Sequence, residues 1–122
     1  YSDEGNKHFY EFIIPENISE RVGKGHKIFI AKDENHIIGM IELKEYHHIC
    51  LLFVDKQYHG RGVAKELFYK VTALAKENSS KNYIDVHSSP YAVPVYEKLG
   101  FRTISGLLET DGIKFYTMQY EL

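Results

Sequence analysis

The feature that most limits the fold is an apolar run, His48–Val54, followed closely by a glycine-bearing turn and an amphipathic segment. The run is apolar on both faces, which is typical of a central strand that is covered from both sides. After the turn, apolar residues recur at the spacing of a helix that packs on a sheet: Val63, Ala64, Leu67, Phe68, Val71, Leu74 and Ala75. This order predicts an α/β fold in which one central sheet carries the helix.

The remaining chain predicts more strands and shorter helices. Apolar residues between Asn6 and Val22 recur at roughly helical spacing, broken by Pro15, which predicts a helix, a break and a second short helix. A short helix is also expected at 94–99, where Gly100 stops it. The other predicted strands are 27–32, 36–43, 83–87, 103–109 and 113–120, the last two joined in a hairpin by a turn at Asp111-Gly112.

Length and composition predict one domain and argue against two kinds of partner. A chain of 122 residues with 43% hydrophobic content can form one modest core, so residues 1–122 are expected to be a single domain. The 15 basic and 17 acidic residues give a net charge of -2, which provides no general attraction for nucleic acid or an anionic membrane. No apolar run is long enough to span a membrane, and the first residues lack the features of a signal peptide.

The single cysteine indicates the redox state of the cellular compartment in which the protein is expected. Cys50 cannot form an internal disulfide and lies in the apolar run, so a buried thiol in a reducing compartment is expected. We therefore expect a cytoplasmic protein.

The glycine turn is a candidate phosphate site. A strand that leads through Gly60 and Gly62 into a helix gathers backbone N–H groups and the positive end of the helix dipole at one point. His59, Arg61 and Lys65 add side-chain donors there. A G-x-G turn without a ligand is at least as common, however, and the sequence has neither the G-K-[ST] of a P-loop nor the third glycine of a dinucleotide fingerprint.

Two motifs resemble those of the GNAT superfamily of acetyl-CoA-dependent N-acetyltransferases. The first family signature, Q/R-x-x-G-x-G/A directly after a strand, is read here as His59-Gly60-Arg61-Gly62-Val63-Ala64, with His59 in the place of Gln or Arg. The second, A-x-x-x-Y-x-x-x-G-F, is read within Ala92–Phe101. The resemblance implies a mixed, mostly antiparallel central sheet flanked by helices. The strand and helix that open the family fold are expected to be missing, so the domain is expected to be short at its N-terminus or to pair with a second copy through an open sheet edge.

The resemblance also implies which residues hold acetyl-CoA. The end of the apolar strand would pair with the pantetheine arm, and the turn would hold the pyrophosphate. Ser89 stands where the family has an asparagine, so it would make part of that contact. The implied cofactor-binding residues are Phe53, Val54, His59, Gly60, Arg61, Gly62, Val63, Ala64, Lys65 and Ser89.

Acetyl transfer to an amine needs a base, an oxyanion donor and an acid for the thiolate. His48 is the predicted base, because strand alternation would place it on the face of Leu52 and Val54, and its usual pKa suits proton removal near neutral pH. The reserve candidates are Glu42, Glu45, Asp85 and His87. The resemblance implies Tyr96 as the acid, and the Val54 N–H is the expected oxyanion donor. No metal site is predicted, since His47 and His48 are neighbours on opposite strand faces.

Three readings of the function remain open on sequence alone. The first is an N-acetyltransferase that acts on a primary amine of a small molecule or peptide. The second is a non-catalytic acyl-CoA-binding regulatory module, and the third is a protein-interaction domain whose glycine turn is structural. Aromatic residues that could line an acceptor pocket, although core packing is their more frequent role, are Phe9, Tyr10, Phe12, Phe115 and Tyr116.

Overall fold

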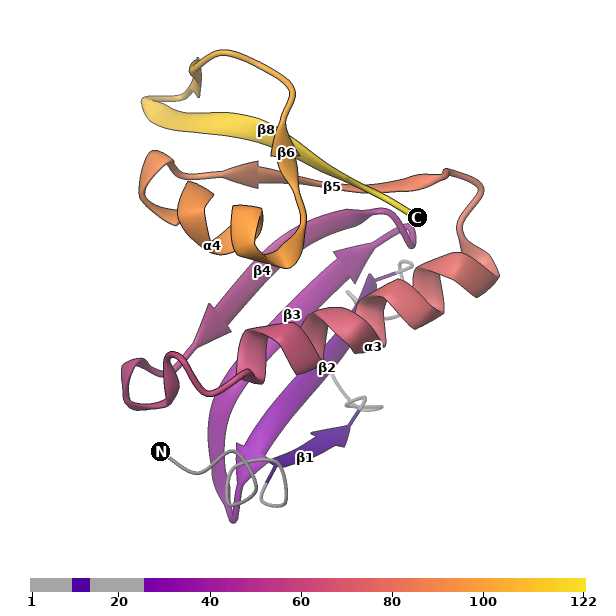
Figure 1. The fold of residues 1–122 in the computed structure, drawn as a ribbon, viewed down its shortest axis with the longest axis vertical. Coiled ribbons are helices and arrows are strands. Elements are labelled where there is room, and N and C mark those ends of the chain that lie inside the picture. The colour runs from indigo at the N-terminus through magenta and orange to yellow at the C-terminus, as the bar shows by residue number, and fades with distance from the viewer. Residues whose placement is uncertain (1–9, 14–25) are drawn as a thin grey trace.

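A computed structural model describes residues 10–13 and 26–122, which form one mixed sheet with helices packed on it. The strands are β1 Tyr10–Ile13, β2 His26–Asp33, β3 His36–Lys44, β4 His48–Val54, β5 Tyr83–Ser88, β6 Arg102–Thr103, β7 Leu108–Thr110 and β8 Ile113–Glu121. The helices are α3 Val63–Asn78 and α4 Val93–Leu99, and the 3-10 turns are η1 Lys56–Tyr58 and η2 Pro90–Ala92. The strand order is β1-β2-β3-β4-β5-β8-β6, with β7 paired on β8 (Figure 1).

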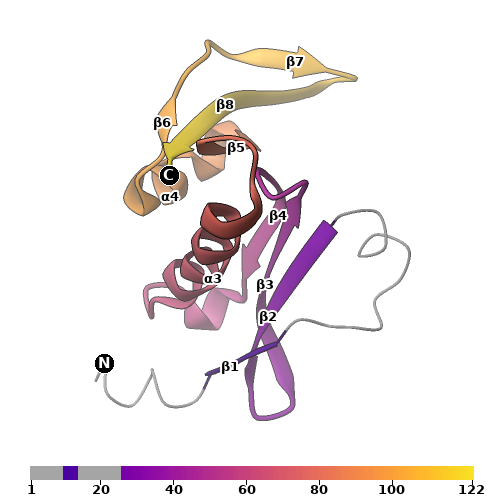
Figure 2. The same cartoon turned by 90° about the vertical axis from the view of Figure 1, so that its right-hand side faces the viewer.

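The predicted fold class is confirmed. Only the β4–β5 pair is parallel among the strand pairs of the described chain, and the other pairs are antiparallel. Figure 2 shows α3 lying along one face of β2, β3 and β4. Within the described residues, no helix is long and apolar enough to cross a bilayer.

One predicted helical stretch is a strand where it is described. Tyr10–Ile13 form β1, which pairs with Ile30–Asp33 of β2, and the rest of that predicted segment lies outside the described residues. Short apolar runs do not distinguish helix from strand, and here an available strand edge decides the outcome. The sheet was expected to lack an edge strand, but β1 pairs with β2. β2 is therefore not an open edge through which a second copy could pair.

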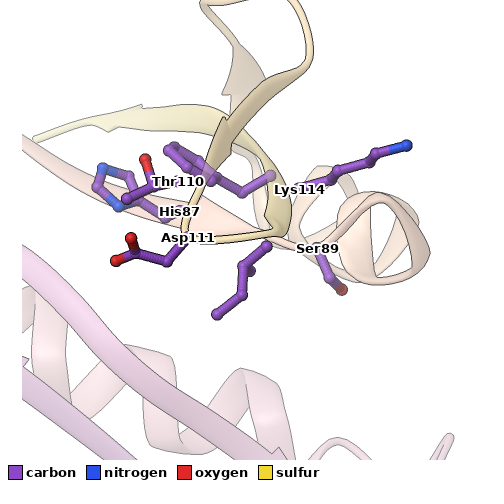
Figure 3. A pocket seen from close by; sticks show the side chains of 7 residues that line it. His87, Ser89, Thr110, Asp111 and Lys114 are labelled. Carbon is purple, nitrogen blue, oxygen red and sulfur yellow. The ribbon is translucent and has the colours of Figure 1, made fainter.

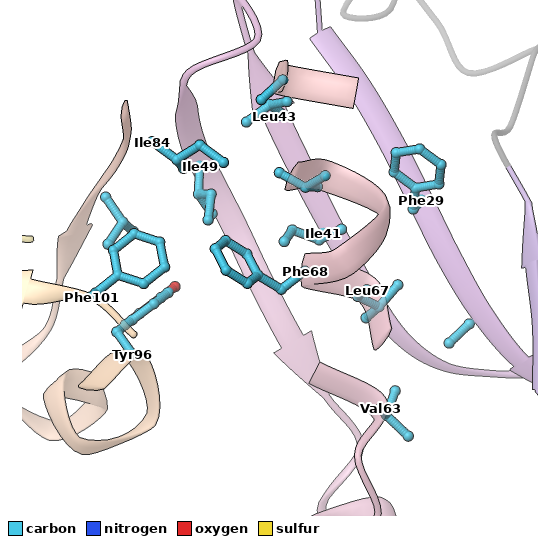
Figure 4. Close-up of a cluster of buried hydrophobic side chains, with 14 of the residues drawn as sticks. Phe29, Ile41, Leu43, Ile49, Val63, Leu67, Phe68, Ile84, Tyr96 and Phe101 are labelled. Atoms are coloured by element: carbon cyan, nitrogen blue, oxygen red, sulfur yellow. The ribbon is translucent and has the colours of Figure 1, made fainter. Parts of the chain in front are cut away.

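The core lies between α3 and the central strands (Figure 4). The buried face of α3 includes Val63, Leu67 and Phe68, as its helical spacing predicts. Gly39 on β3 allows the helix to approach closely, since a Cβ at this position would lie 3.1 Å from Val63 Cγ1. Each fully buried aliphatic side chain of this kind contributes about 1.5–3 kcal/mol.

The prediction that β4 is covered on both faces is wrong. Ile49 is buried, whereas Leu51, Phe53 and Cys50 are exposed, so the expected burial of the thiol is also wrong. In the pairing with β3, Glu42 lies opposite Leu51 and the next residue of β3 lies opposite Ile49, which leaves Cys50 as the extra residue of a β-bulge.

The bulge changes which face each β4 side chain occupies. Leu52 and Val54 pack against the core cluster, as Ile49 does. His48 instead meets Asp85, whose neighbours on β5 are the buried Ile84 and Val86, so both polar side chains lie on the face opposite α3. The predicted shared face of His48, Leu52 and Val54 is therefore wrong, because simple alternation does not continue through a bulge.

Candidate active site

The sheet opens between β4 and β5. The two strands are paired only at His48↔Asp85 and Ile49↔Val86, where the Asp85 N–H also donates to the His47 carbonyl at 2.8 Å. Farther along, β4 stays with β3 while β5 stays with β8, so the strands diverge (Figure 1). The resulting gap is bordered by strand backbone that is not used in β4–β5 pairing.

The backbone of Val54 is turned toward this gap. The Asp55 N–H donates to the Ile38 carbonyl at 2.7 Å, and in an antiparallel ladder the residues alternate between facing the partner strand and facing away. Val54 and Leu52 therefore direct their N–H and C=O groups away from β3. The ring of His59 confirms this direction, because its Nε2 lies 2.8 Å from the Val54 carbonyl oxygen.

The glycine turn stands where β4 ends and α3 begins. Gly60 and Gly62 have φ values of 76° and 80°, which glycine adopts without strain, and space is open around both Cα atoms. Gly62 is the N-cap of α3 and has no side-chain cap, and the first intrahelical bond runs from the Glu66 N–H to the Gly62 carbonyl. The amides of the first helical turn are therefore left without helical partners, which is the arrangement that binds anions.

The cationic side chains of this region lie over aromatic rings. The Arg61 guanidinium carbon is 5.3 Å from the centre of the Tyr58 ring, and the Tyr58 hydroxyl donates to Asp33 at 2.6 Å. Lys65 Nζ is 5.8 Å from the centre of the Tyr69 ring. The structure thus brings together the predicted residues from His59 to Lys65 at one end of the gap.

The predicted base joins two of its reserve candidates in one cluster. His48 Nδ1 lies 2.6 Å from Asp85 Oδ1, and the two side chains are 25% and 22% exposed. The ring centres of His48 and His87 are 5.0 Å apart, and His87 stacks on Phe115 at 4.6 Å. Sequence alone missed the His48–Asp85 contact, although the register of two parallel strands would have revealed it.

The other two reserve candidates for the base, Glu42 and Glu45, lie outside the His48–Asp85 pair. Glu42 is buried and its Oε2 lies 2.6 Å from His26 Nδ1. Glu45 is exposed in the turn between β3 and β4, with a φ of 53°. Neither carboxylate takes part in the His48–Asp85 pair.

A hollow of about 380 Å³ adjoins this cluster at the β7–β8 hairpin (Figure 3). Its lining residues are His87, Ser89, Thr110, Asp111, Ile113, Lys114 and Phe115. The Ser89 hydroxyl caps η2 by accepting the Ala92 N–H at 3.1 Å, so part of its hydrogen-bonding capacity is used locally. Among the predicted acceptor aromatics, Phe115 is in this lining. Phe9 lies outside the described residues, as do the side chains of Tyr10 and Phe12.

Tyr96 is nearly buried on α4, at 7% exposure. Its ring makes an edge contact with Phe101 at 5.4 Å, and in Figure 4 its hydroxyl points from α4 toward the side on which Phe68 and β4 lie. Burial raises the pKa of its phenol to about 12. The hydroxyl therefore remains protonated throughout the neutral range.

The family comparison decides what kind of domain this is. The model of the acetyltransferase (GNAT) domain matches residues 1–122. The chain belongs to the GNAT family. It therefore carries an acetyl-CoA-dependent N-acetyltransferase domain.

Individual relatives of this GNAT domain are distant. The glucosamine 6-phosphate N-acetyltransferase of Trypanosoma brucei brucei is 27% identical, over 78% of this chain and 71% of that protein. A GCN5-related N-acetyltransferase structure from Rhodopseudomonas palustris has 26% identity and a TM-score of 0.71, over 80% of this chain and 62% of that one. A putative streptothricin acetyltransferase from Bacillus anthracis, solved with acetyl coenzyme A, shares the fold with a TM-score of 0.70 and 20% identity, over 93% of this chain and 85% of that one.

The prediction that this GNAT domain departs from the first family signature at His59 is wrong. Counted along the chain, Q-x-x-G-x-G is satisfied by Gln57-Tyr58-His59-Gly60-Arg61-Gly62. His59 therefore occupies a variable position of the signature, and Gln57 supplies the expected residue within η1. The contact of His59 with the Val54 carbonyl ties the turn of this domain to the end of β4.

The buried phenol of Tyr96 makes the stability of the GNAT domain depend on pH. The pKa of Tyr96 is about 12 in the folded chain and near 10 when unfolded, so its stabilising contribution is complete below pH 10 and disappears as the pH rises through 12. Between pH 9 and pH 11, the free energy of unfolding of the wild type should therefore fall by about 1 kcal/mol more than that of Tyr96→Phe. Urea titrations at both pH values measure the difference. Tyr91→Phe, at an exposed tyrosine, is the control and should follow the wild type.

Proposed function

We propose that the domain transfers an acetyl group from acetyl-CoA to a primary amine by direct attack within a ternary complex. The observation that carries this mechanism is the His48–Asp85 pair, which lies where β4 and β5 begin to part. A carboxylate bound to Nδ1 fixes the imidazole tautomer and leaves Nε2 to accept a proton. This arrangement would let His48 act as the base that deprotonates the acceptor ammonium, with Asp85 as its positioning residue.

The gap and the turn offer hydrogen-bonding backbone to acetyl-CoA, which supplies the activated thioester when bound. Leu52 and Val54 offer strand backbone to an extended pantetheine arm, whereas the Phe53 backbone faces β3, so only the side chain of Phe53 could contact the arm. The amides from Gly60 to Ala64 offer donors to a pyrophosphate. His59, Arg61 and Lys65 lie in the turn and the first turn of α3, and Ser89 follows β5 as the N-cap of η2. The Bacillus anthracis neighbour supports this proposal, since that protein was solved with acetyl coenzyme A.

Two further groups would serve the transfer step. The Val54 N–H, turned toward the gap, is suited to stabilise the oxyanion that forms when the amine attacks the thioester. The Tyr96 hydroxyl, which is protonated at neutral pH, is suited to give a proton to the departing thiolate. We assign the oxyanion donor to Val54 and the acid to Tyr96 on these grounds.

The acceptor would enter beside the His48 cluster. The hollow under the β7–β8 hairpin reaches His87, and its lining contributes one carboxylate, Asp111, and one ammonium, Lys114, so it suits a small molecule or peptide that carries polar groups. The name of the trypanosome relative makes glucosamine 6-phosphate one member of a test panel. We propose neither nucleic acid nor membrane as a partner, given the net charge of -2.

A panel assay tests the proposal. Titration calorimetry should show binding of acetyl-CoA, and at least one amine among polyamines, amino sugars, amino acids and peptide N-termini should release free thiol from it. Binding of acetyl-CoA without thiol release for any amine would favour an acyl-CoA-binding regulatory module instead. If coenzyme A at millimolar concentration does not raise the melting temperature, the turn is structural and a protein-interaction domain is the favoured function instead.

A further inference from the structure

Three possible metal ligands meet on adjacent strands away from the His48–Asp85 pair. His26 begins β2, Glu42 lies within β3 and Cys50 is the bulge residue of β4. One ligand atom from each side chain lies within 4.8 Å of the other two, and His26 Nδ1 is 2.6 Å from Glu42 Oε2. The sequence-based reason for expecting no metal concerns only His47 and His48 and does not apply to a set drawn from three strands.

The strand pairing explains why these residues meet. Glu42 lies opposite Leu51, and Cys50 is the extra bulge residue next to Leu51. Glu42 alternates with the core residues Ile41 and Leu43, so its side chain lies on the sheet face opposite α3. Without the bulge, the Cys50 side chain would follow Leu52 toward the core and could not reach Glu42.

The burial of Glu42 makes the cluster a strong candidate for a cation. Its residue is only 2% exposed, and a carboxylate removed from water is stabilised by a positive charge, which His26 supplies only when its ring is protonated. His26 lies against it, partly buried, while Cys50 is exposed. An ion could therefore reach the cluster from the Cys50 side and neutralise a carboxylate held at the opposite side.

We propose that His26, Glu42 and Cys50 bind one Zn²⁺ ion. Imidazole nitrogen, carboxylate oxygen and thiolate sulfur are all zinc ligands, and a thiolate argues against Mg²⁺ or Ca²⁺. Zinc–ligand bonds of about 2.0–2.3 Å place tetrahedral ligand atoms roughly 3.4 Å apart. The His26–Glu42 pair at 2.6 Å would open slightly, and the exposed Cys50 side chain would rotate inward.

The bound ion would connect β2, β3 and β4 at the end of the sheet where His26 lies. Three protein ligands leave one coordination position for water or a further ligand. This inference is independent of the proposed acetyl transfer, because none of the three residues belongs to the groups assigned to that reaction. Its predicted consequence is stability that depends on zinc.

Cobalt and zinc titrations of the untagged chain, pre-treated with a chelator, test the site. We expect one ion per chain, a thiolate-to-cobalt charge-transfer absorption on Co²⁺ addition, and a higher melting temperature with one equivalent of Zn²⁺. Cys50→Ser should abolish the charge-transfer band and weaken Zn²⁺ binding by more than about tenfold, since even loss of an outer partner costs 10–100-fold.

Two histidine variants, one at a control position and one at a proposed ligand, separate this cluster from adventitious binding to other histidines. His36→Asn removes an exposed histidine on β3 and should keep the stoichiometry, the band and the thermal shift. His26→Asn should lower affinity while leaving the Cys50 thiol in place. The proposal is overturned if the wild type binds no stoichiometric ion, or if Cys50→Ser and His26→Asn bind zinc as tightly as the wild type does.

Discussion

His48→Ala should lower kcat at least about 100-fold at neutral pH, while the KM for acetyl-CoA stays within a few-fold of the wild type. The reason is geometric: the imidazole is held by Asp85 at 2.6 Å where β4 and β5 part, and no other histidine of the described chain shares that contact. Removal of the ring would leave the acceptor ammonium without a positioned base. Steady-state thiol-release kinetics with an active amine from the panel give both constants.

Asp85→Asn extends the same test to the positioning residue. An amide at this position can still bond to Nδ1 but no longer favours the correct tautomer or stabilises the imidazolium, so kcat should fall at least about tenfold with little change in either KM. The double variant should be no worse than His48→Ala alone, because Asp85 acts through the imidazole. His36→Ala, at an exposed histidine, is the control. If His48→Ala keeps the wild-type kcat, His48 is not the base and the role passes to a reserve residue such as His87.

Gly62→Ala should raise the Kd for acetyl-CoA at least about tenfold. The residue has a φ of 80° and caps α3, so an added Cβ would project where a phosphate must approach the amides of the turn. Loss of one charge-assisted hydrogen bond costs about 1.5–3 kcal/mol, and about 1.4 kcal/mol corresponds to a tenfold change in Kd. Calorimetric titration with acetyl-CoA, without acceptor, measures the effect directly.

Gly112 offers a matched control for this substitution. Its φ is 79°, and a Cβ there would also meet nothing within 4 Å, but it lies in the β7–β8 turn away from α3. Both variants should lose roughly 1 kcal/mol of stability, because alanine is disfavoured in the left-handed region. Only Gly62→Ala should weaken acetyl-CoA binding. Equal, wild-type-like affinities for the two variants would show that the turn does not hold the pyrophosphate.

Local patterns in the sequence predicted much of this domain. The apolar stripe from Val63 to Ala75 predicted α3 and its buried face, and the glycine turn predicted an open helix N-terminus. Both depend on neighbours in the chain, so periodicity and backbone preference are sufficient to reveal them. The resemblance to the GNAT family came from two such local motifs, and the family match confirms it.

Predictions that relied on counting across a strand or a motif were less secure. Placing His59 at the first signature position shifted the register by two residues, although Gln57 fits the pattern. Regular alternation placed His48 on the same face as Val54, and the bulge at Cys50 places them on opposite faces. The same bulge exposes the thiol that an apolar setting predicted to be buried.

The sequence by itself determined the helix, the turn and the family, because each is encoded by residues that are close together in the chain. Only the tertiary structure decided that His48 meets Asp85, that β4 and β5 part after two paired positions, and that His26, Glu42 and Cys50 converge. These contacts depend on strand register between distant segments, where a shift of one residue moves every side chain to the opposite face. No local pattern fixes that register, so the chemistry proposed for the site follows from the assembled sheet.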